Sequence, residues 1–152
     1  MNNKTFRQTF LKLLALVTVC FAGFGFTAKM GLDSYEIYLN NTLILKQFVN
    51  QPLNLRKLQL DKAKESDQLR IYYTHCTNKG VGTGRRIVIN DQQGHALKTW
   101  EFADVNHADG GMVITVKALR ELEKRYANRQ LSLHYLTDEH PQGELLARVA
   151  LE

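Results

Sequence analysis

Hydrophobic and polar residues alternate along much of the chain, beginning with the segment 34–49. Tyr35 and Ile37 are separated by a single polar position, which is the period-two pattern of a strand with one buried face. Asn40 and Asn41 interrupt this alternation, and asparagine tolerates the left-handed backbone conformation that tight hairpin turns require. The segment therefore predicts two strands that pair as a hairpin.

The stretch 69–102 has the densest strand pattern, with three extended runs separated by two turn-forming loops. Consecutive strands joined by turns commonly pair with their neighbours, so this stretch predicts a three-stranded β-meander. Trp100, the only tryptophan of the chain, and Phe102 fall on the same face of the third run. We therefore expect both aromatic side chains in the hydrophobic core.

The periodicity changes to that of a helix at about residues 116–127. Leu119, Leu122 and Tyr126 recur at helical spacing, and Thr115 is a suitable N-cap residue. These positions predict one amphipathic helix of about three turns that packs one side on the sheets.

The remaining pattern consists of short strand-like runs separated by turn-forming residues, about seven to eight strands in total. A parallel α/β fold is disfavoured, because one helix cannot supply the crossovers that parallel strands need. The expected fold class is therefore all-β: an antiparallel β-sandwich with the one helix near the C-terminal part. We expect residues 29–152 to form this sandwich as a single domain.

Residues 1–28 have the parts of a secretory signal peptide. Basic residues come first, and the hydrophobic run 13–26 that follows is short for a membrane span. Ala22 and Ala28 are candidate residues before the cleavage site. A lipid anchor on Cys20 is the rival interpretation, but Val19 stands where a small residue normally precedes such a cysteine. We expect an exported protein, periplasmic or secreted, with membrane contact only through that disfavoured anchor.

Removing the expected signal peptide changes the charge balance. The whole chain has a formal net charge of +5, from 20 basic and 15 acidic residues. Residues 1–28 contain Lys4, Arg7 and Lys12 and no acidic residue, so residues 29–152 have a net charge of +2. The basic character of the chain thus owes much to the signal peptide, and no nucleic-acid partner is expected.

The glycine-rich segment KGVGTGRR is the first candidate site. Its glycines allow backbone N–H groups to turn inward around an anion, and its basic residues add positive charge. The candidate ligand-binding or anion-binding residues are Lys79, Gly80, Gly82, Gly84, Arg85 and Arg86. The segment matches no phosphate-loop motif, because a strand and not a helix follows the glycines. The alternative is a flexible loop between two strands.

The second candidate site combines His75 and Cys76 with His107, His134 or His140. Imidazole and thiolate are ligands of copper and zinc, so this group is a weak candidate for a metal site. Adjacent residues of a strand point to opposite faces, which argues against a shared metal. Cys76 is the only cysteine after residue 28, so no internal disulfide is expected. The favoured alternative is a shielded cysteine that packs as a small apolar residue.

A still weaker candidate site is a calcium-binding loop made of Asp104, Asn106, Asp109 and Gly110. Oxygen ligands in a loop that ends in glycine are typical of calcium sites. The spacing differs from that of an EF-hand, and no glutamate closes the loop at the expected distance. An ordinary turn-rich loop is therefore the alternative.

The sequence offers little support for catalysis. None of Ser34, Ser66 and Ser132 lies in a Gly-x-Ser-x-Gly motif, and Cys76 belongs to no Cys-x-x-Cys pair. The pattern therefore favours a non-enzymatic binding module that holds an unknown protein, polymer or small ligand through loops or a sheet edge. The alternative is a small periplasmic metal-binding or thiol redox protein centred on His75 and Cys76.

The first prediction concerns export. Protein recovered from its host should lack roughly the first 22 to 28 residues, because the charged and then apolar start is typical of a cleaved signal peptide. Intact-mass measurement of the purified protein checks this expectation. A full-length chain recovered from the cytoplasm would contradict it.

Overall fold

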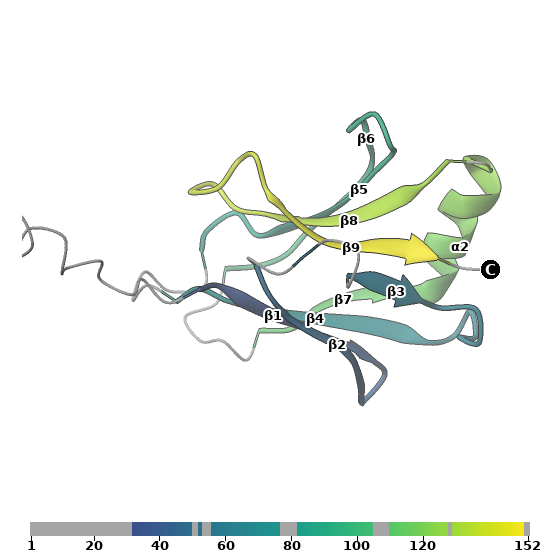
Figure 1. Ribbon diagram of the computed structural model, residues 1–152, viewed down its shortest axis with the longest axis horizontal. Coiled ribbons are helices and arrows are strands. Elements are labelled where there is room, and N and C mark those ends of the chain that lie inside the picture. The colour runs from purple at the N-terminus through teal and green to yellow at the C-terminus, as the bar shows by residue number, and fades with distance from the viewer. Residues whose placement is uncertain are drawn as a thin grey trace, which may run out of the picture. The chain divides into compact units, whose positions relative to one another are not determined.

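The two β-sheets of the protein lie face to face, with one helix at one end (Figure 1). The computed structural model describes residues 32–49, 52, 56–76, 82–104, 110–127 and 129–150. The predicted all-β sandwich with a single helix is confirmed. The predicted signal peptide, residues 1–28, and Cys20 within it lie outside the described residues.

The first sheet has four strands, each antiparallel to its neighbours. Across the sheet they are β2 (Thr42–Phe48), β1 (Ser34–Leu39), β4 (Gln68–Thr74) and β7 (Met112–Thr115). Asn40 has a φ of 55° in the turn between β1 and β2, so the predicted hairpin is confirmed. Ile44 is an extra residue of β2, opposite the step from Ile37 to Tyr38, and forms a β-bulge.

The second sheet has five strands. Across the sheet they are β3 (Lys57–Gln59), β9 (Glu144–Ala150), β8 (Leu131–Leu136), β5 (Arg86–Asn90) and β6 (Ala96–Glu101). The described residues thus form nine strands, slightly more than the sequence predicts. β3 and β9 pair in parallel, in a sandwich that is otherwise antiparallel. The chain reaches β3 from the other sheet and not through a hairpin from β9, so no antiparallel turn dictates their relative direction.

The predicted meander over residues 69–102 is wrong in one respect, because β4 and β5 belong to different sheets. Leu69 and Ile71 on β4, like Ile87 and Ile89 on β5, are fully buried on the inner faces of their sheets. Alternation therefore predicts correctly which face of each strand is buried. It does not distinguish a return to the same sheet from a crossing to the opposite sheet, because both bury the same side chains. Only β5 and β6 pair as the meander requires.

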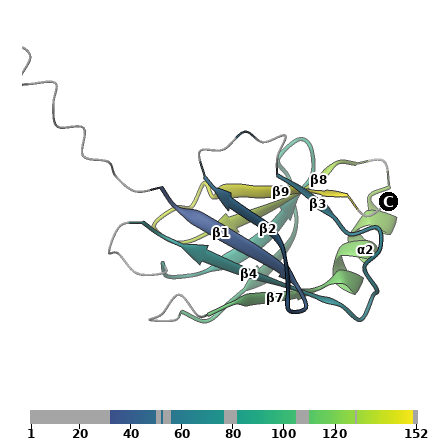
Figure 2. The same ribbon diagram turned by 60° about the horizontal axis from the view of Figure 1, so that its bottom comes forward.

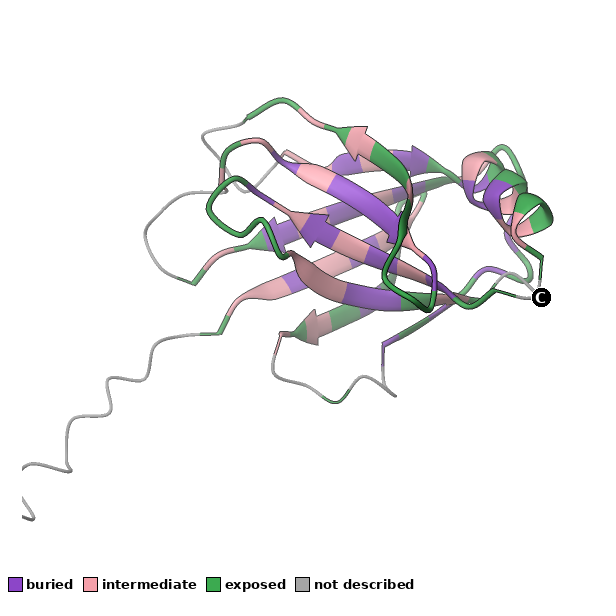
Figure 3. Ribbon diagram, turned by 90° about the horizontal axis from the view of Figure 1, so that it is seen from above, coloured by how far each residue is buried: buried purple, intermediate pink, exposed green. Residues whose placement is uncertain are grey.

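The core lies between the two sheets, and buried and exposed residues alternate along the strands (Figure 3). Both sheets contribute their inward side chains to it. Fully buried residues include Tyr35, Ile37, Leu69, Ile71, Ile87, Ile89, Leu133 and Leu146. Burial of these side chains is the main favourable contribution to folding, as in other domains without disulfides.

The helix α2 (Val116–Arg125) begins where the sequence predicts. The Thr115 hydroxyl oxygen accepts a hydrogen bond from the Ala118 N–H at 3.3 Å, which is the interaction of an N-cap. Leu119 and Leu122 are buried, so the predicted apolar face is the one that packs. Figure 2 shows α2 at the end of the sandwich, where β7 leads into it. No helix within the described ranges is long and apolar enough to cross a membrane.

One charged side chain in the interior joins the two sheets. Arg56 precedes β3 and is only 2% exposed. Its guanidinium forms an ion pair with Glu144 at 3.0 Å and donates to the Leu145 carbonyl oxygen at 2.7 Å, both on β9. It also donates to the carbonyl oxygen of Val49, which follows β2 in the other sheet. A buried cation needs such partners, so Arg56 holds the edges of the two sheets together.

Trp100 and Phe102 are partly buried rather than fully buried, which corrects the expectation that both belong to the core. Trp100 lies on β6, opposite the fully buried Ile87 of β5. β6 is an edge strand and has a neighbour on one side only. Its inward side chains therefore stay partly open to solvent.

The second prediction compares two truncations. Leu133→Ala on the central strand β8 should lower the free energy of unfolding by about 2 to 5 kcal/mol, because it leaves a cavity in a fully buried layer. Trp100→Ala should cost only about 1 to 1.5 kcal/mol, about half of the effect of burying a large side chain completely. Urea unfolding followed by far-UV circular dichroism measures both. An equal or larger cost for Trp100→Ala would contradict the edge position.

Candidate functional site

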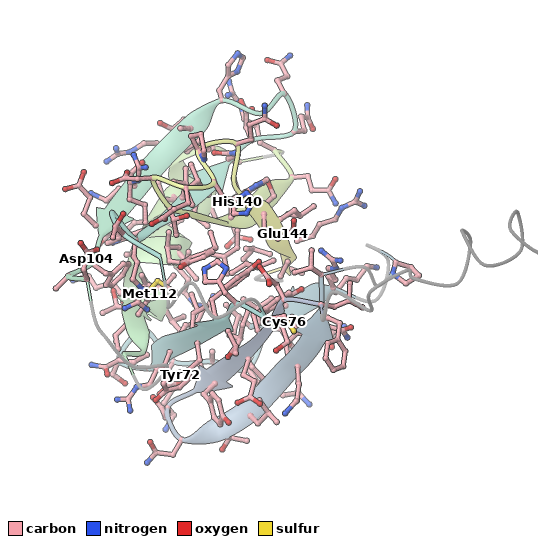
Figure 4. The ribbon with its side chains drawn as sticks, turned by 90° about the vertical axis from the view of Figure 1, so that its left-hand side faces the viewer. Tyr72, Cys76, Asp104, Met112, His140 and Glu144 are labelled. Carbon is pink, nitrogen blue, oxygen red and sulfur yellow. The ribbon has the colours of Figure 1, made fainter. Side chains whose placement is uncertain are left out.

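A small cavity of about 190 Å³ lies at the end of the sandwich away from α2. The four-stranded sheet and its flanks contribute Asp33, Tyr73 and His75 to its lining, and the other sheet side contributes Tyr135, His140 and Glu144. Figure 4 views this end of the molecule and labels His140, Glu144 and Cys76. Carboxylates, imidazoles and phenols thus meet where the inner faces of the two sheets open to solvent.

Asp33 organises one side of the cavity. Its Oδ2 accepts a hydrogen bond from the Tyr73 hydroxyl at 3.1 Å and lies 3.0 Å from His75 Nδ1, while Oδ1 accepts from the Cys76 N–H at 2.9 Å. Burial works to raise the pKa of Asp33, but the hydrogen bonds from Cys76, Tyr73 and His75 outweigh it and hold that pKa below its usual value. Asp33 is therefore an anion that positions the His75 ring.

The other ring nitrogen of His75 points across to the second sheet. Its Nε2 lies 3.4 Å from the Tyr135 hydroxyl, and the Tyr73 and Tyr135 rings stack with centroids 4.2 Å apart. When His75 is neutral and donates through Nδ1 to Asp33, Nε2 is an acceptor that faces a phenol. Burial raises the pKa of both Tyr73 and Tyr135, so both phenols stay protonated at neutral pH. The arrangement suits hydrogen bonding to a small polar molecule.

The structure separates the two central residues of the predicted metal site. The His75 side chain is largely buried in the cavity wall, whereas Cys76 is a free, exposed cysteine. The interpretation of Cys76 as a shielded packing residue is therefore wrong. His107 lies outside the described residues, and within the described ranges no three His, Cys, Asp or Glu side chains are placed to hold a metal ion. The copper or zinc site stays a prediction.

In the described part of the glycine-rich loop, two backbone donors have partners within the chain. Gly82 and Gly84 have φ values of 79° and 58°, in the left-handed region. The Thr83 N–H donates to the Glu139 carboxylate at 3.0 Å, and the Gly84 N–H donates to Asp104 Oδ1 at 2.8 Å. These two donors therefore bind carboxylates of the protein itself.

The two arginines of the same candidate site are also engaged. Arg85 is 3% exposed and donates to the carbonyl oxygens of Gly110 and Ala103, and Arg86 pairs with Asp138 at 3.0 Å. Lys79 and Gly80, the remaining residues of that site, lie outside the described part of the chain. An external anion would have to displace these contacts, so binding here stays a prediction.

The candidate calcium ligands are only partly described. Asp104 accepts from the Gly84 N–H, and the Gly110 carbonyl oxygen accepts from the Arg85 guanidinium. Asn106 and Asp109 lie outside the described residues. A positive side chain at the Gly110 carbonyl disfavours a cation there, and the calcium site stays a prediction.

Sequence reasoning missed a larger feature on the outer face of the four-stranded sheet. A shallow hollow of about 610 Å³ lies over β1 and β4. It is lined by Ser34, Glu36, Tyr38, Asn40, Asn41, Arg70, Tyr72 and Thr74. The Tyr38 and Tyr72 rings meet edge to face, with centroids 5.7 Å apart and planes at 85°. The available signal was the presence of tyrosines at positions that the alternation assigns to the polar face.

Sequence reasoning also missed the surface of the edge strand β2. Leu43, Ile44 and Phe48 on this strand are exposed, and the fourth exposed large hydrophobic residue of the described ranges, Leu32, lies just before β1. The run Leu43–Leu45 departs from strict alternation, which was a signal for this surface. Three of the four exposed large hydrophobic residues of the described ranges thus lie on the edge strand β2.

Comparison of the chain with protein families, curated proteins and solved structures finds no match. Function is therefore inferred from the surfaces that the side chains form.

The third prediction concerns acid stability. The hydrogen bond from the Thr83 N–H is the main cause that lowers the pKa of Glu139 from 4.5 to about 2. Because the unfolded chain binds this proton more readily, the stabilising contribution of Glu139 is present above about pH 4.5 and is lost as the pH falls toward 2. Glu139→Gln should therefore destabilise the protein at neutral pH, and its difference from the wild type should shrink in acid.

Urea unfolding between about pH 3 and pH 7 measures this difference. Glu121→Gln is the matched control, because Glu121 is exposed on α2 and accepts no hydrogen bond within the described part of the chain. A Glu139→Gln difference that is the same at every pH would contradict the prediction.

Proposed function

We propose that the protein is an exported, non-enzymatic binding module that holds an extended segment of another protein along β2. The observation that carries this proposal is the exposure of Leu43 (45%), Ile44 (37%) and Phe48 (45%) on one strand. Scattered hydrophobic residues on a surface need no explanation, but a group of them on one element is typical of an interaction site.

The position of β2 supports strand addition. β2 pairs with β1 on one side, and no described strand pairs with its other side. An edge strand offers unpaired N–H and C=O groups, which an extended peptide binds through main-chain hydrogen bonds. Charged residues commonly guard such edges, but Lys46, the one charged residue of β2, is paired with Glu36 of β1 at 2.5 Å. The bulge at Ile44 interrupts regular pairing on this strand, so an added strand would pair on one side of the bulge or the other.

The side chains of β2 define the partner. Leu43 and Phe48 lie opposite Tyr38 and Ser34 of β1, on the outer face of the sheet. An added strand would place its own outward side chains beside these two residues, so a partner with hydrophobic residues at those positions gains from their burial. Two copies of β2 paired about Lys46 would place two lysines opposite each other, which favours a different protein over a second copy.

The geometry at His75 supports binding over catalysis. The ring nitrogen that is free of Asp33 faces the Tyr135 phenol, whose pKa burial raises. A phenol that ionises only at high pH is a poor nucleophile at neutral pH. The Asp33–His75 pair therefore serves the structure of the cavity wall in this proposal.

The fourth prediction tests β2. Linear peptides selected on the folded protein from a random library should slow amide hydrogen exchange of residues 42–48, because the added strand covers their backbone. Leu43→Lys should weaken their binding at least about tenfold, through lost hydrophobic contact and a charge on the edge. Ala96→Lys, an exposed position on the edge strand β6 of the other sheet, is the matched control and should leave binding unchanged.

Two results would contradict the proposal. One is that the peptides protect another surface and leave residues 42–48 unchanged. The other is that sedimentation of the wild type shows a concentration-dependent dimer that Leu43→Lys abolishes, which would assign β2 to a second copy of the chain.

A further inference from the structure

The hollow on the outer face of the four-stranded sheet has a chemistry different from that of the hydrophobic edge. We infer that it binds an acidic saccharide, with Arg70 holding a carboxylate of the ligand and Tyr38 and Tyr72 packing against its sugar ring. The inference is independent of strand addition at β2, because the hollow lies over β1 and β4.

The lining of the hollow suits a sugar. All eight lining residues carry a hydroxyl, amide, carboxylate, guanidinium or phenol group, and none is aliphatic. A sugar ring needs donors and acceptors around its rim and a flat, weakly polar surface against its C–H groups. The perpendicular Tyr38 and Tyr72 rings supply that surface, since tyrosine combines an apolar ring with a polar tip.

The charges in the hollow favour an anionic ligand. Glu36 is compensated, because it pairs with Lys46 at 2.5 Å and accepts a hydrogen bond from the Tyr38 hydroxyl at 2.8 Å. Arg70 lines the same hollow, and its guanidinium has no hydrogen-bond or ion-pair partner in the described part of the chain. A planar guanidinium binds a carboxylate through two parallel hydrogen bonds. The hollow therefore has one uncompensated positive charge in a geometry that fits a carboxylate.

Gly111, just before β7, lies against Arg70 and Tyr72, the two main contact residues of the hollow. A Cβ atom at Gly111 would lie 2.7 Å from Arg70 Cγ, closer than real Cβ atoms come, and 3.0 Å from Tyr72 Cζ, tighter than most real Cβ contacts. The absence of a side chain at Gly111 thus lets Arg70 and Tyr72 pack directly over the backbone. Tyr38 lies opposite Arg70 in the strand register, so all three groups are placed by the rigid sheet. Such placement lowers the entropic cost of ligand binding.

An uronic-acid saccharide satisfies both parts of this site, the cation and the rings. An acidic peptide satisfies the cation but presents no ring of C–H groups to the tyrosines. We therefore commit to the saccharide and treat binding of an acidic peptide as an outcome of the test.

The experiment is calorimetric titration of residues 29–152 of the exported protein with tetrasaccharides of galacturonate, of mannuronate and guluronate, and of chondroitin. Maltotetraose is the neutral probe, and tetraglutamate is the peptide probe. At least one acidic tetrasaccharide should bind at least about tenfold more tightly than maltotetraose and tetraglutamate. Raised salt should weaken that binding, because a charge pair on an open surface is screened.

Variants separate the roles of the residues. Arg70→Gln should remove the preference for the acidic tetrasaccharide, and Tyr72→Ala should weaken binding at least about tenfold. Gly111→Ala, which displaces both side chains without removing either, should also weaken binding. Arg148→Gln is the matched control, because Arg148 is an exposed strand arginine of the other sheet. Thermal unfolding confirms that each variant is folded.

Three outcomes would overturn the inference: no acidic tetrasaccharide binds, Arg70→Gln binds as the wild type does, or tetraglutamate binds as tightly as the saccharides. The Arg70→Gln variant distinguishes the two proposals, since it should remove the preference for the acidic tetrasaccharide and leave peptide addition to β2 intact, because β4 does not pair with β2.

Discussion

The buried guanidinium of Arg56 is the interaction on which the arrangement of the two sheets depends. It binds Glu144 and the Leu145 carbonyl oxygen of one sheet and the Val49 carbonyl oxygen of the other. A cation that is shielded from water needs such a set of oxygen partners. Removing the Glu144 carboxylate would leave the buried guanidinium charge without its counter-charge. Arg56 therefore links the start of β3 to the end of β2 and the beginning of β9, which belong to different sheets.

The same contact shapes the cavity between the sheets. Val49 and Glu144, which bind Arg56, are also lining residues of the cavity, together with Asp33 and His75. The Tyr73 and Tyr135 rings close the space from the two sheets by stacking on each other. The charged and aromatic groups at this end of the sandwich hydrogen-bond and stack with one another. Residue types that are common in catalytic sites therefore serve here to join the two sheets.

The surfaces that remain open lie on the four-stranded sheet. At the glycine-rich loop, the carboxylates of Glu139, Asp138 and Asp104 occupy the donors that an external anion would need. On the outer face of the four-stranded sheet, Arg70 has no such carboxylate among the described residues. Next to it, β2 exposes hydrophobic side chains. One sheet thus offers a polar hollow and an apolar edge side by side, which suits a module that holds ligands on the exterior of a rigid sandwich.

The sequence by itself determined the local features of the fold. Alternation identified the buried face of β1, β4 and β5, the asparagines at 40 and 41 marked the hairpin turn, and Thr115 marked the start of α2. These predictions succeed because each depends on a few neighbouring residues. The tertiary structure alone decided that β4 and β5 lie in different sheets, that β3 runs parallel to β9, and that Trp100 lies on an edge strand. It also decided which carboxylates meet the glycine loop and that Arg70 meets none in the part of the chain the structure describes. Strand partners and charge partners are far apart in the sequence, and only packing brings them together.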